Sequence, residues 1–315
     1  MENAIELVNV TKQFGSQIAV NDLSLNVPRG SIYGFIGPNG SGKTTTLRMI
    51  LRIIQPETGV VSVLGKTQGK TADDRLGYLP EERGLYKRMR VRSLLTYYAR
   101  LKGFYDCQDA IHQWLVRLDA VEWANKRIDM LSKGMAQKIQ FISAVIANPE
   151  LVILDEPFSG LDPVNLEVLR DAVLWLREQG TTVVFSTHDM GVAEKMCDTI
   201  FMIFNGNKVL DGTLEDIQSR FPANRLRFRF SGNGALSASE LLSNVETKSG
   251  HYEAEIDPHR SQDVLQFLMK QGPLEHFEII KPTLHEIFVQ IAKPDVSSGN
   301  GKSTDVGSQV PQLSR

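Results

Sequence analysis

The sequence has few cysteines and no apolar run long enough to span a membrane. Its 315 residues include only Cys107 and Cys197, which lie far apart. Neither a disulfide framework nor a cysteine-based zinc site is indicated, and a reducing compartment is the simpler expectation. The longest apolar runs, such as FISAVIA and IFMIF, fall far short of the roughly 20 residues that a spanning helix requires. We expect a cytoplasmic chain that does not cross a membrane by itself.

Charge of one sign is not in excess either. Lys and Arg total 35 against 37 Asp and Glu, so no overall field favours wrapping nucleic acid or lying on an anionic membrane. The N-terminal stretch carries Glu2, Glu6 and Lys12 where a secretory signal needs an uninterrupted apolar core. The hydrophobic content of 42% is ample for a packed core, and the length suits one large α/β domain with a smaller one.

Two kinds of strand pattern are present. Residues 5–10 and 18–27 alternate between apolar and polar side chains, which predicts antiparallel strands. Residues 31–37, 151–156 and 181–187 are short, continuous apolar runs rich in β-branched or aromatic residues, which predicts buried parallel strands. Together they indicate a sheet with a buried parallel part and a separate antiparallel part.

Helical patterns lie between these strands. Apolar residues recur at helical spacing after Lys43 until Pro56, and again from Met135 to Ile146 until Pro149. This strand, loop and helix order predicts an α/β fold whose ligands bind at the carboxyl ends of the strands.

The chain divides into a large first domain, a small second domain and a tail. Two extended runs around Asn205 and Gly206 predict a hairpin that closes the first domain, which we place at residues 1–220. Residues 221–292 read as a small α+β domain, with strands at 225–230, 252–256 and 277–281 and helices at 261–272 and 283–292. Residues 293–315 are rich in Ser, Gly and Asn without an aromatic residue, so we expect disorder there.

A phosphate-binding loop is predicted between the strand at 31–37 and the helix after it. Gly37, Gly42, Lys43 and Thr44 satisfy the pattern G-x-x-x-x-G-K-[ST] in the strand-to-helix context that the pattern demands. Glycines let backbone N–H groups turn inward around an anion, the lysine neutralises the β and γ phosphates, and the threonine hydroxyl ligates Mg²⁺. The alternative is a glycine-rich turn with an exposed lysine. The predicted ATP-binding residues here are Gly37, Pro38, Asn39, Gly40, Ser41, Gly42, Lys43, Thr44 and Thr45.

The strand at residues 151–156 supplies two carboxylates to the same edge of the sheet. We expect Asp155 to hold Mg²⁺ through its water shell and Glu156 to act as the general base on the attacking water. An Asp-Glu pair after a strand is more often a helix cap or an ion-pair partner. Together with a phosphate loop upstream, the catalytic interpretation is the better one.

Three further motifs give a family resemblance. LSKGMAQKIQ at residues 131–140 precedes the Asp-Glu strand, and FSGLDP and FSTHD follow it. With these motifs, residues 4–220 resemble the ATPases of ATP-binding cassette (ABC) transporters. The resemblance implies a P-loop cassette with an antiparallel β subdomain and a helical subdomain. It also implies two cassettes that close head to tail over two ATP molecules, so that a second copy or a related subunit is needed.

The resemblance assigns roles to individual residues. Ser132 and Gly134 resemble the signature donors to the γ-phosphate of the facing subunit's ATP, and Asp162 resembles the residue that couples the two sites. His188 resembles the switch histidine that contacts the γ-phosphate and steadies the transition state with Glu156. Phe14 resembles the aromatic residue that stacks on adenine, although a buried phenylalanine in an edge strand would look the same.

The sequence departs from the family pattern at two places. Lys133 and Met135 replace the usual signature glycine and glutamine. Glu81 stands where many cassettes have a glutamine that reaches toward Mg²⁺ and the γ-phosphate, and a carboxylate there repels ATP unless a metal neutralises it. Our hypothesis is that Glu81 interacts with Mg²⁺ or its water. The alternative is that Glu81 and Glu82 are solvated loop charges.

These departures and the C-terminal domain resemble the exporter ATPases of drug-resistance and sodium-extrusion systems, which act with separate membrane permease subunits. The loop at residues 83–92 has five basic residues and no acidic one, and it either docks the membrane subunit or is a solvated loop. We expect no nucleic-acid partner and a location on the inner face of the cell membrane.

Other classes of ATPase fit less well. Translation ATPases of this superfamily carry two cassettes in one chain, and DNA-repair ATPases place a long coiled coil before the signature. A small-molecule phosphate-loop kinase lacks the signature and the switch histidine.

Overall fold

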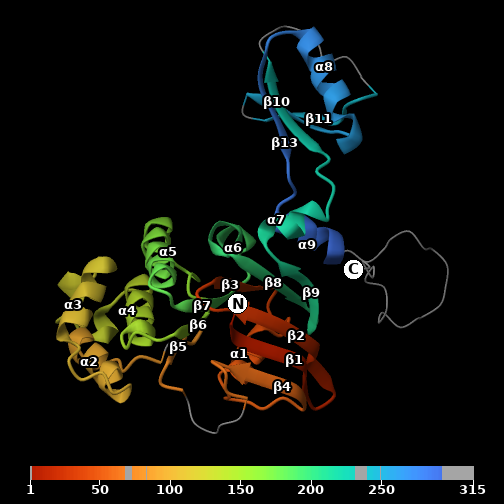
Figure 1. Ribbon diagram of the computed structural model, residues 1–315. Helices are drawn as coiled ribbons and strands as arrows, with labels where there is room; N and C mark the ends of the chain where they lie inside the picture. Colours follow the sequence, from red (N-terminus) through yellow and green to blue (C-terminus); the bar gives the residue numbers. More distant parts are fainter. Residues whose placement is uncertain (1, 68–72, 83, 231–239, 249, 293–315) are drawn as a thin grey trace. The chain divides into compact units, whose positions relative to one another are not determined.

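The protein folds as two compact units, one that ends at Pro222 and one that begins at Ala223 (Figure 1). The computed structural model describes residues 2–67, 73–82, 84–230, 240–248 and 250–292. The tail predicted to be disordered, residues 293–315, lies outside the described residues. Each unit has its own sheets and its own apolar core, so each is described by itself.

The main sheet of the first unit positions the site. Its six strands are, in spatial order, β5 (Leu76–Leu79), β6 (Leu151–Asp155), β7 (Thr182–Thr187), β3 (Ile32–Ile36), β8 (Thr199–Phe204) and β9 (Asn207–Gly212). The first five are parallel, and β9 runs antiparallel to β8. Strands β3, β6 and β7 are buried along their whole length, as strands covered on both faces must be. This confirms the three predicted parallel strands.

A second, three-stranded sheet accompanies it. Strand β1 (Asn3–Phe14) lies between β2 (Gln17–Pro28) and β4 (Thr58–Val63), and both pairings are antiparallel. The two predicted antiparallel strands are therefore confirmed, whereas β4 was missed. Its residues are mostly exposed or half-buried and begin with Thr-Gly, so they lack the strict alternation that marks β1 and β2.

The turn between β8 and β9 follows from its two residues. Asn205 and Gly206 have φ angles of 48° and 77°, and the flanking residues Phe204 and Asn207 pair across the hairpin. A two-residue turn of this kind requires positive φ at both positions, which Asn-Gly tolerates best. The predicted hairpin is confirmed.

Seven α-helices are described in the first unit, and six of them contribute to one of two apolar cores. Helices α2 to α5 gather at one end of the main sheet, while β1, β2 and β4 lie at the other (Figure 1). One core joins the helices to one face of the sheet, through residues such as Leu95, Ile142 and Phe185. The other joins α1 and the three-stranded sheet to the opposite face, through residues such as Phe35 and Leu47. The helices are α1 (Lys43–Ile50), α2 (Val91–Leu101), α3 (Gln108–Arg117), α4 (Lys133–Val145), α5 (Pro163–Glu178), α6 (Met190–Met196) and α7 (Leu214–Ser219).

Helix α1 is shorter than the apolar spacing suggests. The pattern continues until Pro56, but the helix ends at Ile50. The chain turns at Arg52, whose φ is 58°, and the N–H of Ile53 donates to the carbonyl of Arg48 at 2.9 Å. The apolar residues beyond the helix still pack against the core, so spacing alone overestimates its length.

The second unit is a four-stranded antiparallel sheet with two helices. Its strand order is β11 (Ser243–Lys248), β12 (His251–Glu255), β10 (Arg225–Phe230) and β13 (Leu274–Ile280). Helix α8 (Ser261–Gln271) supplies Val264 and Leu268 to a small core with Leu226 and Phe228, and α9 (Leu284–Ala292) follows β13. The predicted strands and helices of this unit are confirmed, but β11 was missed because it is polar and exposed throughout.

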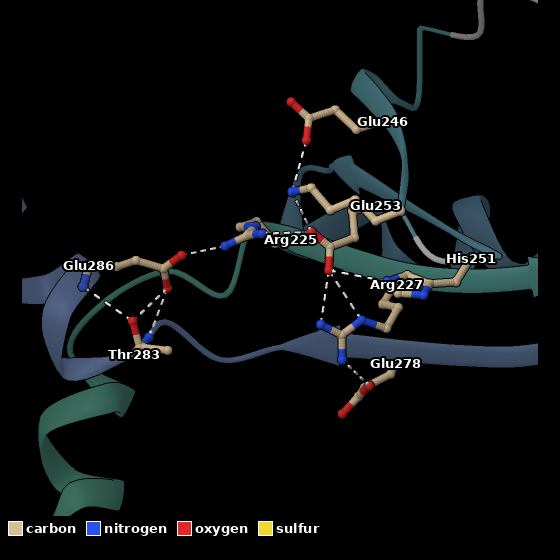
Figure 2. A network of polar contacts seen from close by, with 9 residues as sticks. Arg225, Arg227, Glu246, His251, Glu253, Glu278, Thr283 and Glu286 are labelled. Atoms are coloured by element: carbon tan, nitrogen blue, oxygen red, sulfur yellow. Dashed lines mark hydrogen bonds and ion pairs between the residues drawn. The ribbon is translucent and has the colours of Figure 1, made fainter. Parts of the chain in front are cut away.

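One face of this sheet carries a charge network around a buried carboxylate, Glu253, which is 7% exposed (Figure 2). Arg225 and Lys248 approach Glu253 Oε2 at 2.8 and 3.1 Å, and Arg227 approaches Oε1 at 2.9 Å. His251 Nε2 lies 3.6 Å from Oε1. Hydrogen bonds from Arg227 and Lys248 lower the pKa of Glu253 to about 2. The network therefore stabilises this unit only while the carboxyl is ionised.

We predict that Glu253→Gln destabilises the second unit by roughly 1–3 kcal/mol at pH 7, because the partly exposed cations around this buried position lose their ionic partner. A carboxyl whose folded pKa is depressed contributes stability above about pH 5 and loses it as the pH falls toward 2, so the variant should also lose most of that pH dependence. Hydrogen exchange of β10 and β12 in the full chain at pH 7 and pH 3 measures both effects.

The matched control is Glu255→Gln. Glu255 is exposed on the same strand, and its side chain accepts from the neutral Asn244. This control should stay within about 0.5 kcal/mol of the parent. An unchanged pH dependence in Glu253→Gln would contradict the assigned role of the carboxylate.

Candidate functional site

The nine predicted phosphate-loop residues run from the end of β3 into the first turn of α1. Gly42 is the N-cap of α1 with a φ of 111°, a value that glycine adopts readily. At Gly37 a Cβ atom would stand 2.3 Å from the carbonyl oxygen of Ile203 and 2.7 Å from Ser41 Oγ. Two of the glycines are thus required by geometry, one by its dihedral angle and one by lack of space.

Lys43 folds back over this loop. Its ammonium donates to the carbonyl oxygens of Gly37 and Pro38 at 2.7 and 3.1 Å and lies 3.9 Å from Glu156 Oε1. Burial lowers the pKa of Lys43, and the charges of Glu156, Asp155 and Glu81 oppose that shift. The alternative of an exposed lysine on a glycine turn is excluded, since Lys43 is 5% exposed.

Asp155 is held at the end of β6 by two hydroxyl groups. Ser186 Oγ donates to Asp155 Oδ1 at 2.5 Å and also accepts the N–H of Glu156 at 3.0 Å. Thr44 Oγ1, in the first turn of α1, lies 3.5 Å from the same carboxylate oxygen. The structure therefore brings together Thr44 and Asp155, two of the three residues expected to face a metal. Ser186 was not predicted, because in the sequence it looks like a polar residue at the end of a buried strand.

Glu156 and His188 form a direct pair. His188 Nδ1 lies 3.0 Å from both carboxylate oxygens of Glu156, and since a carboxylate only accepts, Nδ1 carries the donated proton. Glu156 is 8% exposed and has a φ of 50°. Few residues other than glycine adopt a positive φ, and those that do are often found at functional sites. The side chain of His188 is 56% exposed, so it can reach a ligand from the outside.

The residues of this site fit a nucleotide with Mg²⁺. Ser41 Oγ is buried in the loop and has no hydrogen-bond partner among the described residues. Nowhere in the described residues do three or more His, Cys, Asp or Glu side chains lie together so that they could hold a metal. A hydroxyl and one carboxylate leave the remaining positions to phosphate and water oxygens, which is the coordination that Mg²⁺ prefers.

The signature residues form a second, separate cluster. Ser132 caps α4 by accepting the N–H of Met135 at 3.3 Å, and Asp162 caps α5 by accepting the N–H of Asn165 at 3.0 Å, which lowers the pKa of Asp162. A Cβ on Gly134 would lie 3.4 Å from Leu161, so the two caps are neighbours. No hydrogen bond or ion pair between described residues connects this cluster to the phosphate loop.

Phe14 and Glu81, the two remaining predicted site residues, are both exposed. Phe14 ends β1 and is 52% exposed, with the ammonium of Lys12 5.3 Å from the ring centroid, so the alternative of a buried phenylalanine is wrong. Glu81 is exposed in the turn after β5, and its charge acts on the pKa of Lys43. Both are available to a ligand.

A glycine-rich loop between a buried strand and a helix, with an Asp-Glu pair at the end of a neighbouring parallel strand, defines a phosphate-loop ATPase. Residues 20–159 match the ABC transporter family, and residues 212–292 match the C-terminal domain of DrrA1-3-like ATP-binding proteins. The chain belongs to the ATP-binding proteins of ABC transporters, which bind ATP and hydrolyse it to power transport.

Curated relatives and solved structures agree with this family assignment. The chain is 40% identical over 293 residues to the ABC transporter ATP-binding protein YhaQ of Bacillus subtilis, covering 90% of this chain and 96% of the relative. It is 33% identical over 224 residues to the bacitracin transport ATP-binding protein BcrA of Bacillus licheniformis, covering 70% of this chain and 73% of the relative. A solved structure of the ATP-binding subunit of an ABC transporter superposes with a TM-score of 0.65 at 29% identity, covering 69% of this chain and 93% of the solved chain. The predicted cassette fold is confirmed.

We predict that Gly37→Ala abolishes ATP binding, because its methyl group would collide with the backbone of Ile203 and displace the loop. Gly40 is the matched control. Its φ is 79°, but no atom lies within 4 Å of the position that a Cβ would take. Gly40→Ala should therefore weaken ATP binding by only the roughly 1–2 kcal/mol that left-handed backbone strain costs. Titration with a fluorescent ATP analogue measures both. Equal losses would show that space at Gly37 is not the constraint.

Proposed function

We propose that this protein is the ATP-hydrolysing subunit of an exporter and works as a head-to-tail dimer with a second copy or a related ATPase subunit. The observation that carries the proposal is the separation of two half-sites on one chain. The phosphate loop with Glu156 and His188 forms one half, and the caps at Ser132 and Asp162 form the other. Two chains in opposed orientation would place each half against its complement. A relative named for Nod factor export supports the direction.

Individual residues then take distinct roles. The loop Gly37–Thr45 and Lys43 hold the phosphates, Phe14 stacks on the adenine, and Thr44 with Asp155 holds Mg²⁺. When bound, Mg²⁺ neutralises phosphate charge. Glu156 accepts the proton of the attacking water, and His188, held by Glu156, faces the γ-phosphate. Ser132 and Gly134 face the γ-phosphate held by the partner.

We predict that Glu156→Gln binds ATP, hydrolyses it at least 100-fold more slowly and accumulates as an ATP-locked dimer. The γ-phosphate is then not removed, so the closed state persists. Size-exclusion chromatography with ATP and with ADP measures the dimer, and phosphate release measures turnover. Glu178→Gln, at an exposed glutamate that ends α5, is the control and should behave as the parent. Turnover at the parental rate in Glu156→Gln would contradict the assigned base.

The membrane partner is expected to be a separate permease. Among the described residues, every helix is too short or too polar to span a bilayer. Four apolar or aromatic side chains near one another in sequence are exposed: Tyr86, Tyr97, Leu101 and Tyr105. Lys87 and Arg88 are exposed beside them, and Arg83 of the same basic loop lies outside the described residues. This surface would dock the permease and place the protein on the inner face of the cell membrane, with no role for nucleic acid.

Charge reversal at Lys87 and Arg88 tests the proposed docking surface better than charge reversal at Arg90. Arg90 donates to the carbonyl of Asn125 at 2.7 Å, so its charge reversal would also disturb the fold. We predict that the double variant Lys87→Glu and Arg88→Glu lowers co-purification with the permease at least fivefold at low salt, since two exposed cations of the proposed docking surface are reversed.

ATPase activity without the permease should stay as in the parent. Lys195→Glu, at an exposed lysine on α6, is the control for a charge reversal outside this loop. Undiminished co-purification of the double variant would rule out docking through this loop.

A further inference from the structure

Phe14, proposed above to stack on the adenine, is carried by a hairpin that passes beside the phosphate loop. It ends β1 and pairs with Gln17, at the start of β2, across a two-residue turn. Two residues further, about 7 Å along a strand, the carbonyl oxygen of Ala19 lies 2.5 Å from the position that a Cβ on Gly42 would take. Gly42 caps α1, so the hairpin contacts the phosphate-binding end of that helix.

A lysine lies over one face of the Phe14 ring. The Lys12 ammonium is 5.3 Å from the ring centroid, within the range in which the negative face of an aromatic ring attracts a cation. The side chain of Lys12 is 15% exposed, whereas Phe14 is 52% exposed. The ammonium is therefore largely withdrawn from water against a ring that is itself open to a ligand.

Glu57 holds the lysine and the end of the strand in place. Its Oε1 accepts from the Lys12 ammonium at 2.7 Å, and its Oε2 accepts the N–H of Gln13 at 3.1 Å. Its own N–H donates to the carbonyl of Thr11 at 2.9 Å. The hydrogen bond from Lys12 lowers the pKa of Glu57, so this carboxylate stays ionised at neutral pH. One residue thus binds the three consecutive residues directly before Phe14.

We propose that Lys12 is a positioning residue of the nucleotide site, whose ammonium closes one face of Phe14 so that the base stacks on the other face. The cation draws the π electrons of the ring toward itself, which weakens their repulsion of the π electrons of a stacked base. Lys12 thus strengthens stacking without touching the nucleotide. This inference rests on the proposed stacking of adenine on Phe14 and adds the residue that sets it.

The first test separates the base from the phosphates. ADP and pyrophosphate carry the same two phosphate groups, and neither has the γ-phosphate that closes the proposed dimer. In calorimetric titrations of the full chain, Lys12→Met should weaken ADP binding about threefold, the size of one exposed cation–π contact. Pyrophosphate binding should stay as in the parent, because no phosphate contact is removed. Parental ADP affinity in Lys12→Met, or an equal loss for pyrophosphate, overturns the proposal.

The second test asks whether the effect of Lys12 passes through the ring. Phe14→Ala should weaken ADP binding by at least about fivefold, as the loss of base stacking on an aromatic side chain does. Adding Lys12→Met to Phe14→Ala should then weaken binding no further, whereas independent effects would multiply. A full effect of Lys12→Met in the Phe14→Ala background overturns the positioning role.

Two further variants distinguish positioning from a general loss of structure. Lys12→Arg keeps a cation for both Glu57 and the ring, so it should retain the ADP affinity that Lys12→Met loses. Lys66→Met is the matched control, because it also removes a lysine from an ion pair, with Asp73 at 3.2 Å, and it should bind ADP as the parent does. A loss in Lys12→Arg or in Lys66→Met equal to that in Lys12→Met overturns the proposal.

This inference and the proposed function can fail separately. If Phe14→Ala binds ADP like the parent, the proposed stacking is wrong and this inference is wrong with it. If Phe14→Ala weakens ADP binding while Lys12→Met does not, only the role of Lys12 is wrong. Neither result bears on the ATP-locked dimer of Glu156→Gln.

Discussion

The site depends on the register of three buried parallel strands. Asp155 at the end of β6 pairs with Ser186 of β7, and Thr187 of β7 pairs with Ile36 at the end of β3. Segments far apart in the sequence therefore leave the sheet at one level, where the Ser186 hydroxyl ties Asp155 to the N–H of Glu156. A slip of one residue would turn every side chain of a strand to the other face, so the apolar runs that fix the register also fix the chemistry.

This placement gathers charges that water cannot screen. Lys43, Asp155 and Glu156 are all nearly buried, and only one of the three is a cation. A phosphate group would add negative charge, which supports the proposal that Mg²⁺ accompanies the nucleotide. Burial of these groups is thus a physical reason for nucleotide and metal to enter together.

Much of this could be predicted from the sequence because it is local. Continuous apolar strands, the glycine loop and the Asn-Gly hairpin each reflect a backbone requirement that a few adjacent residues satisfy. Contacts between distant segments could not be predicted. Ser186 resembles any polar residue in a buried strand, and Gln140 is one of several polar residues on α4, so neither reveals the carboxylate or loop that it binds. Strand β11 has no buried residue and therefore no pattern.

The unusual signature places a positive charge at Lys133, and the helix cap at Ser132 is formed. Met135 still provides the backbone N–H that Ser132 accepts, so the helix cap does not depend on its side chain. The side chain of Lys133 extends over Gly160. A Cβ atom on Gly160 would lie only 2.9 Å from the Lys133 ammonium. The lysine and the glycine are therefore complementary, one filling the space that the other leaves. In the proposed dimer, the facing phosphate would meet the usual backbone donors and one additional positive charge.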